Sequence, residues 1–443
     1  MRYIPNTPED REEMLKAIGA KDFRELIRDV PEGLLLKGPL ALPPALSEHE
    51  LLRELAEMAA ENSDTDRYVC FLGAGAYDHF VPSIVNFIAS RSEFYTAYTP
   101  YQAEVSQGTL QAAFEYQSMV CELTGLGAAN ASMYDGASAM AEAALMAQRI
   151  TKRGELAVSR AVHPNYRAVL KTYMRGIKSP VTEIPYVEGE GATDLEALRQ
   201  DVDEKTAAVI IQYPNFFGCV EDLAEAAKVA HENGALLVAV IDPIAPGLLK
   251  SPGELGADIA VGEGQPLGKT LSFGGPYLGL FACREEHLRQ MPGRVVGETR
   301  DANGNRGYVL TLQAREQHIK RERATSNICT NEALVALMAA VYLSALGKHG
   351  IRMVAELCLR NAHYAIDALE KAGAKRAFAA PFFKEFAVKV KSVPALNKKL
   401  LKEGIIGGLD LGRYYPELKG HMLIAVTEKR TKEEIDSLAM NFK

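Results

Sequence analysis

The sequence predicts an α/β protein with a mainly parallel sheet in a large domain and a smaller α+β domain at the C-terminal end. From residue 155 onward, short apolar runs such as ELAVS, AAVIIQYP and ALLVAVID alternate with amphipathic stretches of helical length. Uninterrupted apolar runs are typical of strands that are buried on both faces, and strands joined through helices pair in parallel. Further along, the strand-like runs EFAVKVK and HMLIAVTE indicate the smaller domain.

Three divisions of the chain are expected: a helical arm with a linker over 1–65, the large domain over 66–325 and the small domain over 326–443. The prolines of 38–47 mark the linker. A helix is expected over LQAAFEYQSMVCELTG, where Gly125 can end it. The apolar run at 333–346 predicts a buried helix, because it is too short to cross a bilayer comfortably.

The remaining elements follow from the same periodicity. Further strands are expected at VTEIPYV, ADIAVG and LGLFAC, and the helices between strands at HPNYRAVLKTYMRG, DLEALRQDV and DLAEAAKVAHENG. The segment TKEEIDSLAMNF predicts a closing helix.

The composition restricts the class of protein. With 443 residues, 47% of them hydrophobic and 24% charged, the chain resembles ordinary globular proteins with substantial cores. The net charge of −7 argues against a nucleic-acid binder, which normally carries a basic excess. The start MRYIPNTPEDREEM lacks an apolar signal region, and the six cysteines form no CxxC pair. We therefore expect a cytoplasmic protein with no membrane contact, no disulfide framework and no metal site.

The segment from Tyr95 to Gly108, YTAYTPYQAEVSQG, is the most distinctive stretch of the chain. It has neither helical nor strand periodicity, and Pro100 removes a backbone donor and favours an extended Thr99. Its tyrosines and glutamines offer aromatic faces with neutral donors and acceptors, which suit a pocket wall. A polar surface loop is the simpler alternative. Because a well-defined helix follows directly, we favour a working surface.

Several blocks of the sequence resemble the glycine cleavage system P-protein, glycine dehydrogenase (decarboxylating). They are YIPNTPEDREEML, FLGAGAYDHFVP, SQGTLQAAFEYQSMVCELTGL and GRVVGETRDANGNRGYVLTLQAREQHIKRERATSNICTNEAL, and together they span almost the whole chain. The resemblance implies the fold type I architecture of pyridoxal 5'-phosphate (PLP) enzymes, PLP-dependent transferase-like. The single-chain family members are built from two related halves. This chain resembles the N-terminal half, which is a separate subunit in the split enzyme.

The resemblance also implies a pseudo-site, a region shaped like a cofactor site. In fold type I enzymes the cofactor phosphate lies at the helix start that corresponds here to Gly136, Ala137 and Ser138, where free N–H groups attract anions. An ordinary helix cap is the alternative. His163 corresponds to a histidine that stacks on the cofactor in the lysine-bearing half. Asp242 corresponds to the aspartate that pairs with the pyridine nitrogen, although an Asp-Pro turn that caps the strand is equally compatible.

The covalent link to PLP requires a lysine just past a strand. Counting back from the Gly-Gly-Pro shared with the family places the expected position at Gln265, whose amide cannot form that link. Lys269 lies four residues further on, and we expect it to be a surface or structural lysine. A self-sufficient PLP enzyme that uses Lys269 is the alternative. The same stretch does not match a P-loop, because Gly264 and Gly262 leave three and five residues before Gly-Lys-Thr where four are needed.

Other motifs are expected to be structural. In FLGAGAYDHF, Asp78 replaces the third glycine of a dinucleotide fingerprint, so a tight turn is expected. His79 is expected to be a hydrogen-bonded core residue, with a general base as the alternative. A basic run predicts a solvated helix face, with a docking surface for an acidic carrier protein as the alternative. Its members are Arg315, Lys320, Arg321 and Arg323.

The function implied by the resemblance is shared between two chains. A lysine-bearing partner subunit is expected to bind PLP covalently, and the two subunits together decarboxylate glycine and pass the aminomethyl group to the lipoyl arm of H-protein. No catalytic residue is expected in this chain alone. The loop from Tyr95 to Gly108 is expected to face the partner's cofactor site, and a purely scaffolding subunit is the alternative. The interface candidates are Tyr95, Tyr98, Tyr101, Gln102 and Glu104.

Overall fold

The computed structural model describes residues 5–328 and 331–442, and the chain divides into two compact units, Met1–Asn62 and Ser63–Lys443. The first unit contains α1 (Pro8–Ala17), α2 (Phe23–Leu26) and α3 (Glu48–Ala59). The linker residues that precede α3 have no regular structure, as their prolines predict. The predicted domain limits at 65 and 325 stay predictions.

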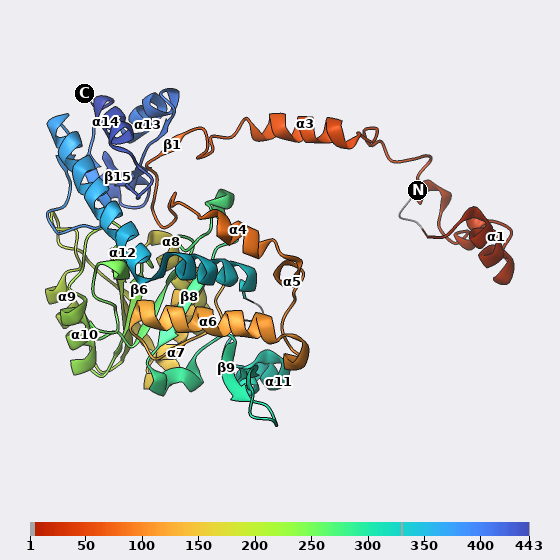
Figure 1. Ribbon diagram of the computed structural model, residues 1–443, viewed down its shortest axis with the longest axis horizontal. Coiled ribbons are helices and arrows are strands. Elements are labelled where there is room, and N and C mark those ends of the chain that lie inside the picture. The colour runs from red at the N-terminus through yellow and green to blue at the C-terminus, as the bar shows by residue number, and fades with distance from the viewer. Residues whose placement is uncertain (1–4, 329–330, 443) are drawn as a thin grey trace. The chain divides into compact units, whose positions relative to one another are not determined.

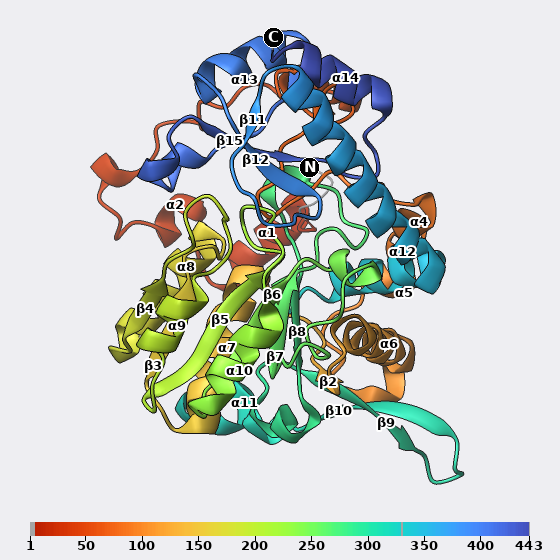
Figure 2. The same cartoon turned by 90° about the vertical axis from the view of Figure 1, so that its left-hand side faces the viewer.

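The second unit contains a seven-stranded sheet in the order β2-β8-β7-β6-β5-β3-β4 (Figure 2). The adjacent strands β4, β3, β5, β6 and β7 pair in parallel, whereas β8 is antiparallel to both β7 and β2. The strands are β2 (Ala128–Ala129), β3 (Glu155–Ser159), β4 (Val181–Ile184), β5 (Thr206–Tyr213), β6 (Leu236–Ile241), β7 (Ile259–Glu263) and β8 (Gly279–Cys283). The apolar runs from ELAVS to LGLFAC therefore form strands as predicted.

Helices cover both faces of this sheet. Ala208 and Ile210 of β5 belong to the core beneath α7 (Gly136–Thr151) and α8 (Pro164–Ile177), while Val209 and Ile211 belong to the core beneath α9 (Leu195–Asp201) and α10 (Leu223–Glu232). On the side of β7 and β8, α6 (Gln107–Thr124) and the first part of α12 (Ala333–Lys371) lie side by side (Figure 1). Because successive residues of a strand point to opposite faces, continuous apolar strands fill both cores.

The helix α12 links this sheet to a smaller antiparallel one. It breaks at Gly347, where φ is +59°, so the buried helix predicted for 333–346 is its first part. Among the described residues, α12 is the one helix long and apolar enough to span a membrane by length and composition, yet both parts contribute to internal cores. The small sheet has the order β11 (Lys375–Arg376), β12 (Glu385–Lys389), β15 (His421–Ala425) and β14 (Leu409–Asp410).

The small sheet packs against the second part of α12 together with α13 (Val393–Lys402) and α14 (Lys432–Met440). Two short pairings complete the second unit. In the first, β1 (Val69–Cys70) pairs in parallel with β13 (Ile405–Ile406), which follows α13. In the second, β9 (Val295–Arg300) and β10 (Arg306–Thr311) form an antiparallel hairpin. The remaining α-helices of the described residues are α4 (Ser83–Ala89) and the single turns α5 (Ser92–Tyr95) and α11 (Gln317–Lys320).

Candidate functional site

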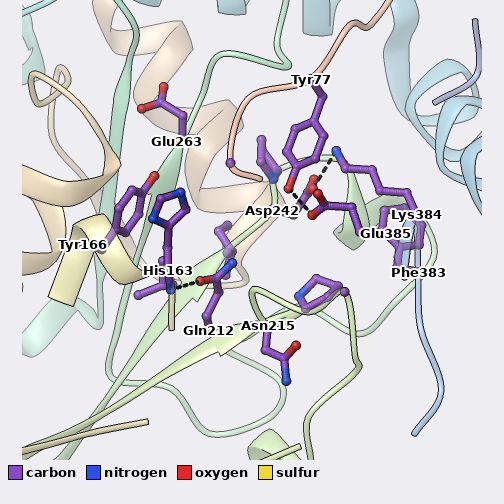
Figure 3. A pocket seen from close by; sticks show the side chains of 16 residues that line it. Tyr77, His163, Tyr166, Gln212, Asn215, Asp242, Glu263, Phe383, Lys384 and Glu385 are labelled. Atoms are coloured by element: carbon purple, nitrogen blue, oxygen red, sulfur yellow. Dashed lines mark hydrogen bonds and ion pairs between the residues drawn. The ribbon is translucent and has the colours of Figure 1, made fainter. Parts of the chain in front are cut away.

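A small cavity lies at the carboxyl ends of β5, β6 and β7, where open α/β sheets bind ligands (Figure 3). His163 and Asp242, two residues of the predicted pseudo-site, line it. Its volume is about 30 Å³. Pockets that hold cofactor-sized ligands measure roughly 300–1,000 Å³, and about 10–15 Å³ is needed for one water. The cavity therefore has space for water molecules and not for a coenzyme.

Lys384 lines this cavity and is buried in it. It comes immediately before β12 and is 2% exposed, and its Nζ lies 2.6 Å from Asp242 Oδ2. The same nitrogen lies 3.0 Å from His79 Nε2 and 3.6 Å from the centre of the Tyr77 ring. Asp242 thus already has a buried cationic partner from its own chain. The next residue, Glu385, accepts a hydrogen bond of 2.6 Å from the Tyr77 hydroxyl (Figure 3).

Gln265, at the position expected for the cofactor lysine, is fully enclosed and fully hydrogen-bonded. Its Nε2 donates to the carbonyls of Tyr77 and Lys269 at 3.0 and 2.7 Å, and its Oε1 accepts from Tyr77 N at 2.9 Å. Of the described residues that line the cavity, none is Lys269. The Gln265 side chain therefore connects the backbone at Tyr77 to the loop after β7 by hydrogen bonds. Lys269 contributes only its backbone carbonyl to these bonds.

The predicted anion cradle is occupied by carboxyl groups of this chain. Gly136 N donates to Glu263 Oε2 at 3.1 Å, and Ser138 N donates to Asp135 Oδ1 at 2.7 Å in a capping box. Glu263 also accepts from the backbone of Gln265 and Leu278. Burial raises the pKa of Glu263 to about 8, although these N–H groups oppose the shift. The first turn of α7 is thus a satisfied cap, with Ala137 buried in it.

His163 is held in one orientation. Its Nε2 contacts the carbonyl of Ala74 at 2.8 Å, its Nδ1 accepts from Asn165 N at 3.1 Å, and its ring stacks on Tyr166. Burial lowers the pKa of His163 to about 4, so the ring is neutral and donates through Nε2. A Cβ at Gly75, where φ is +104°, would lie 2.9 Å from this ring. One face of the His163 ring is therefore covered by Tyr166.

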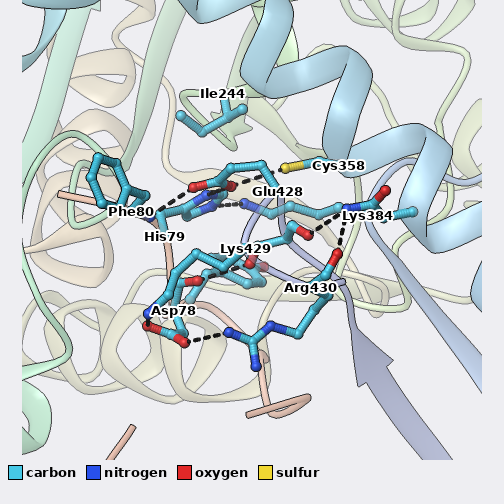
Figure 4. Close-up of polar contacts among 12 residues, drawn as sticks. Asp78, His79, Phe80, Ile244, Cys358, Lys384, Glu428, Lys429 and Arg430 are labelled. Atoms are coloured by element: carbon cyan, nitrogen blue, oxygen red, sulfur yellow. Dashed lines mark hydrogen bonds and ion pairs between the residues drawn. The ribbon is translucent and has the colours of Figure 1, made fainter. Parts of the chain in front are cut away.

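His79 belongs to a buried polar network beside this cavity (Figure 4). Its Nδ1 lies 2.6 Å from Glu428 Oε2, which also accepts from Cys358 Sγ at 3.4 Å. Despite burial, the pKa of Glu428 is lowered to about 2 by His79 and by the Phe80 N–H. The side chains of His79, Cys358 and Glu428 lie close enough to hold a metal ion. Their donor atoms are committed to one another, and the Lys384 ammonium beside them opposes a second cation.

Asp78 pairs with two cations from the segment after β15. Lys429 Nζ lies 2.7 Å from Oδ1, and Arg430 Nη2 lies 3.1 Å from Oδ2 (Figure 4). The residue that breaks the dinucleotide fingerprint is thus an anchor between the 71–80 segment and the small sheet. The turn expected in that motif is present at Ala74 and Gly75, both of which have positive φ.

The tyrosine-rich segment lies elsewhere in the second unit. Tyr95 ends α5, Tyr98 and Tyr101 are in irregular backbone, and all three are exposed. Tyr95 and Tyr98 line a second cavity of about 100 Å³, and the Tyr101 hydroxyl accepts a hydrogen bond from Arg294 Nη2 at 3.4 Å.

The two remaining interface candidates, Gln102 and Glu104, are exposed and do not line this second cavity. The backbone forms a single 3-10 turn at Ala103–Val105. The last two residues of the segment, Gln107 and Gly108, belong to α6. Of the predicted set, Tyr95 and Tyr98 therefore share the second cavity, and Tyr101 contacts Arg294 in its wall.

Several site residues were missed by the sequence analysis, and one prediction was wrong. Lys384, Glu263 and Arg294 carry no local motif, although a Lys-Glu pair at the start of the apolar run EFAVKVK hints at a buried charge. The basic run does not form one helix face, because it is split between α11 and two 3-10 turns. Arg315 is partly buried and donates to Gly293 O at 2.8 Å, whereas Lys320, Arg321 and Arg323 are exposed.

Comparison with known proteins agrees with this geometry. The sequence profile of the glycine cleavage system P-protein family matches residues 1–442. The chain belongs to the P-protein family. Two curated relatives, from Desulforamulus reducens and Carboxydothermus hydrogenoformans, are 57% and 56% identical to it, each over 99% of this chain and 98% of the relative. Both are named probable glycine dehydrogenase (decarboxylating) subunit 1.

A solved P-protein structure is also similar. It is a glycine decarboxylase (P-protein) of the glycine cleavage system in inhibitor-bound form, with 45% identity and a TM-score of 0.90 over 100% of this chain and 99% of that one. A sphingosine-1-phosphate lyase from Burkholderia pseudomallei, 16% identical, has a TM-score of 0.66 over 92% of this chain and 91% of its own. That likeness concerns the fold alone. The predicted fold type I architecture of PLP enzymes is confirmed.

Proposed function

We propose that this chain is the cofactor-free subunit of a two-subunit, cytoplasmic P-protein. Paired as a heterodimer with a lysine-bearing subunit, it decarboxylates glycine and transfers the aminomethyl group to the lipoyl arm of H-protein. PLP, held covalently by the partner, supplies the electron-withdrawing ring that decarboxylation needs. The names of the relatives as subunit 1 support a second subunit.

One observation carries this proposal: the cofactor-shaped region is filled by the chain's own side chains. Lys384 pairs with Asp242, Glu263 occupies the helix start at Gly136, and Gln265 stands at the lysine position. These residues do not fit PLP. A P-protein chain of this kind needs another chain to bind the cofactor, and the family's two-subunit form offers one.

Exposed apolar and aromatic side chains support a partner surface. Within the first unit, α3 leaves Leu51, Leu55 and Met58 exposed along one helix face. In the second unit, Tyr95 and Tyr98 are 68% and 79% exposed. Large exposed aromatic residues are typical of interfaces. The tyrosine loop is the part of this chain that we assign to the partner's cofactor site.

The proposal is tested by titrating PLP into this chain, into the lysine-bearing subunit and into their mixture. Each sample is reduced with borohydride and examined by mass spectrometry, and release of carbon dioxide from carboxyl-labelled glycine is measured with H-protein present. We expect a covalent adduct on the partner alone and carbon dioxide release in the mixture. An adduct on this chain, at Lys269 above all, would establish the self-sufficient enzyme instead.

Loop variants separate a working subunit from a scaffold. Tyr101→Phe and Gln102→Ala are expected to lower turnover of the mixture severalfold without unfolding the chain, because both side chains are exposed. Tyr414→Phe, at a partly exposed tyrosine outside the loop, is the matched control. Unchanged kinetics in both loop variants would favour the scaffolding role.

A further inference from the structure

The second cavity has an unusual composition. It lies between the tyrosine segment, α6, the β9–β10 hairpin and the start of α12. Its walls are mainly apolar, with Phe94, Leu310 and Leu337 among them, and Arg294 is the one charged residue among those that line it. The volume is about 100 Å³, and since one water needs about 10–15 Å³, a ligand of a few non-hydrogen atoms fits.

Arg294 is buried without a full set of partners. It is 6% exposed, and the one hydrogen bond that its side chain makes to a described residue is the 3.4 Å contact from Nη2 to the Tyr101 hydroxyl. Its Nε has no hydrogen-bond partner, and the nearest carboxylate oxygen, Glu316 Oε2, lies 3.8 Å away. Glu316 Oε1 is also buried without a partner. Incompletely satisfied buried donors are costly, so an acceptor in the cavity would stabilise this guanidinium.

We propose that this cavity is a binding site for a small carboxylate, held by Arg294. The planar guanidinium presents parallel N–H groups that match a carboxylate, and the apolar walls strengthen the ion pair by excluding water. Asn331 also lines the cavity, and its Nδ2 donates to Ala131 O at 3.1 Å. The cavity therefore suits a compact molecule that carries a carboxylate.

The natural ligand follows from the proposed function, on which this step rests. The proposed function makes glycine the substrate. Glycine is the smallest amino acid and has the required carboxylate and size. Arg294 would then recognise the substrate's carboxylate from this chain, next to the loop assigned to the partner's cofactor site. Tyr101, whose ring lies 5.5 Å from the guanidinium carbon, would close over it.

The test uses the full chain alone and saturation-transfer NMR with acetate, glycine, methylammonium and inorganic phosphate. We expect acetate and glycine to bind, methylammonium not to bind, and phosphate to bind more weakly than acetate. Arg294→Gln should weaken acetate binding about tenfold or more, since a hydrogen bond to a charged group contributes about 1.5–3 kcal/mol. Arg294→Lys should retain part of it. Arg300→Gln, at an exposed arginine of the same hairpin, is the matched control and should bind like the unchanged chain.

Acetate binding that survives Arg294→Gln, no acetate binding at all, or tighter phosphate binding would each overturn the proposal. If Arg294→Gln lowers the melting temperature, Ala113→Leu narrows the cavity and keeps the arginine, and it too should abolish acetate binding. Because these measurements need no partner, they are independent of the reconstitution experiment. In the reconstituted enzyme, Arg294→Gln should raise KM for glycine more than it lowers kcat, whereas a failed reconstitution would refute the proposed function alone.

Discussion

The Lys384 ammonium lies 2.6 Å from the Asp242 carboxylate, and the pair joins the start of β12 in the small sheet to the end of β6 in the main sheet. The two side chains are 2% and 11% exposed. In an enzyme that binds PLP, the corresponding aspartate faces the protonated pyridine nitrogen. Here the chain supplies its own cation to Asp242.

Lys384→Met should destabilise the chain by about 3–5 kcal/mol, because it leaves a buried carboxylate unpaired. The double variant Lys384→Met/Asp242→Asn should recover part of this loss, since the carboxylate is then neutral. Urea unfolding of both single variants and the double variant measures the coupling between the two residues. The exposed pair Lys432–Asp436, also 2.6 Å apart, is the control. Lys432→Met should have little effect, and an equal loss in both lysine variants would refute a special role for Lys384.

Gln265→Lys is expected not to create a PLP-binding chain. The new amine would enter a region where Glu263 still covers the helix start and Lys384 still pairs with Asp242. Borohydride reduction and peptide mass spectrometry after incubation with PLP should find no pyridoxyl group at position 265. A stoichiometric adduct at that position would show that the side chains filling the cavity move aside readily.

The main sheet was predictable because its strands are apolar throughout and its helices carry local caps. Gly125, for example, ends α6 with φ of +67°, as the local sequence indicates. The filled pocket was not predictable, because Lys384 lies far from Asp242 in the sequence and belongs to no motif, although Asp242 itself was expected at this site. Local patterns place charges at strand ends, but tertiary packing decides which of them become buried together.

The same limit applies to the tyrosine segment. Its irregular backbone and aromatic content could be inferred from Pro100 and from the residue types, and Tyr98 indeed lines a cavity. Arg294 could not be inferred, because it enters that cavity from the hairpin region, far along the chain. The basic run was misjudged for a related reason: Arg315 turns inward to bond Gly293 O, which charge patterning alone does not reveal.

Glu385 should make the stability of the chain depend on pH. Burial raises its pKa from 4.5 to about 7, although Ala74 N, the Tyr77 hydroxyl and Lys384 oppose the shift. A raised folded pKa means that the folded state binds the proton more tightly. The stabilisation is therefore complete below about pH 4.5 and is lost as pH rises through about 7.

Glu385→Gln removes this titration and retains a neutral partner for Tyr77. Relative to the unchanged chain, its free energy of unfolding should rise by up to about 3 kcal/mol between pH 5 and pH 8. Urea unfolding at both pH values measures this difference. For Glu403→Gln, at an exposed carboxyl group, the free energy of unfolding should change with pH as it does in the unchanged chain. If the free energy of unfolding of Glu385→Gln also changed with pH as in the unchanged chain, Glu385 would already be ionised at pH 5.

Gly218 is expected to be essential to the contact between the two sheets. Its φ is +84°, and a Cβ there would lie 1.9 Å from the backbone oxygen of Glu385, while Phe383 N donates to Gly218 O at 3.1 Å. Gly218→Ala combines backbone strain with a backbone clash and should cost about 2 kcal/mol or more. Gly154→Ala, where a Cβ meets no atom within 4 Å, should change stability by less than about 0.5 kcal/mol. Similar unfolding midpoints for the two variants would show that β12 shifts easily, and the cavity beside Lys384 would then be adaptable.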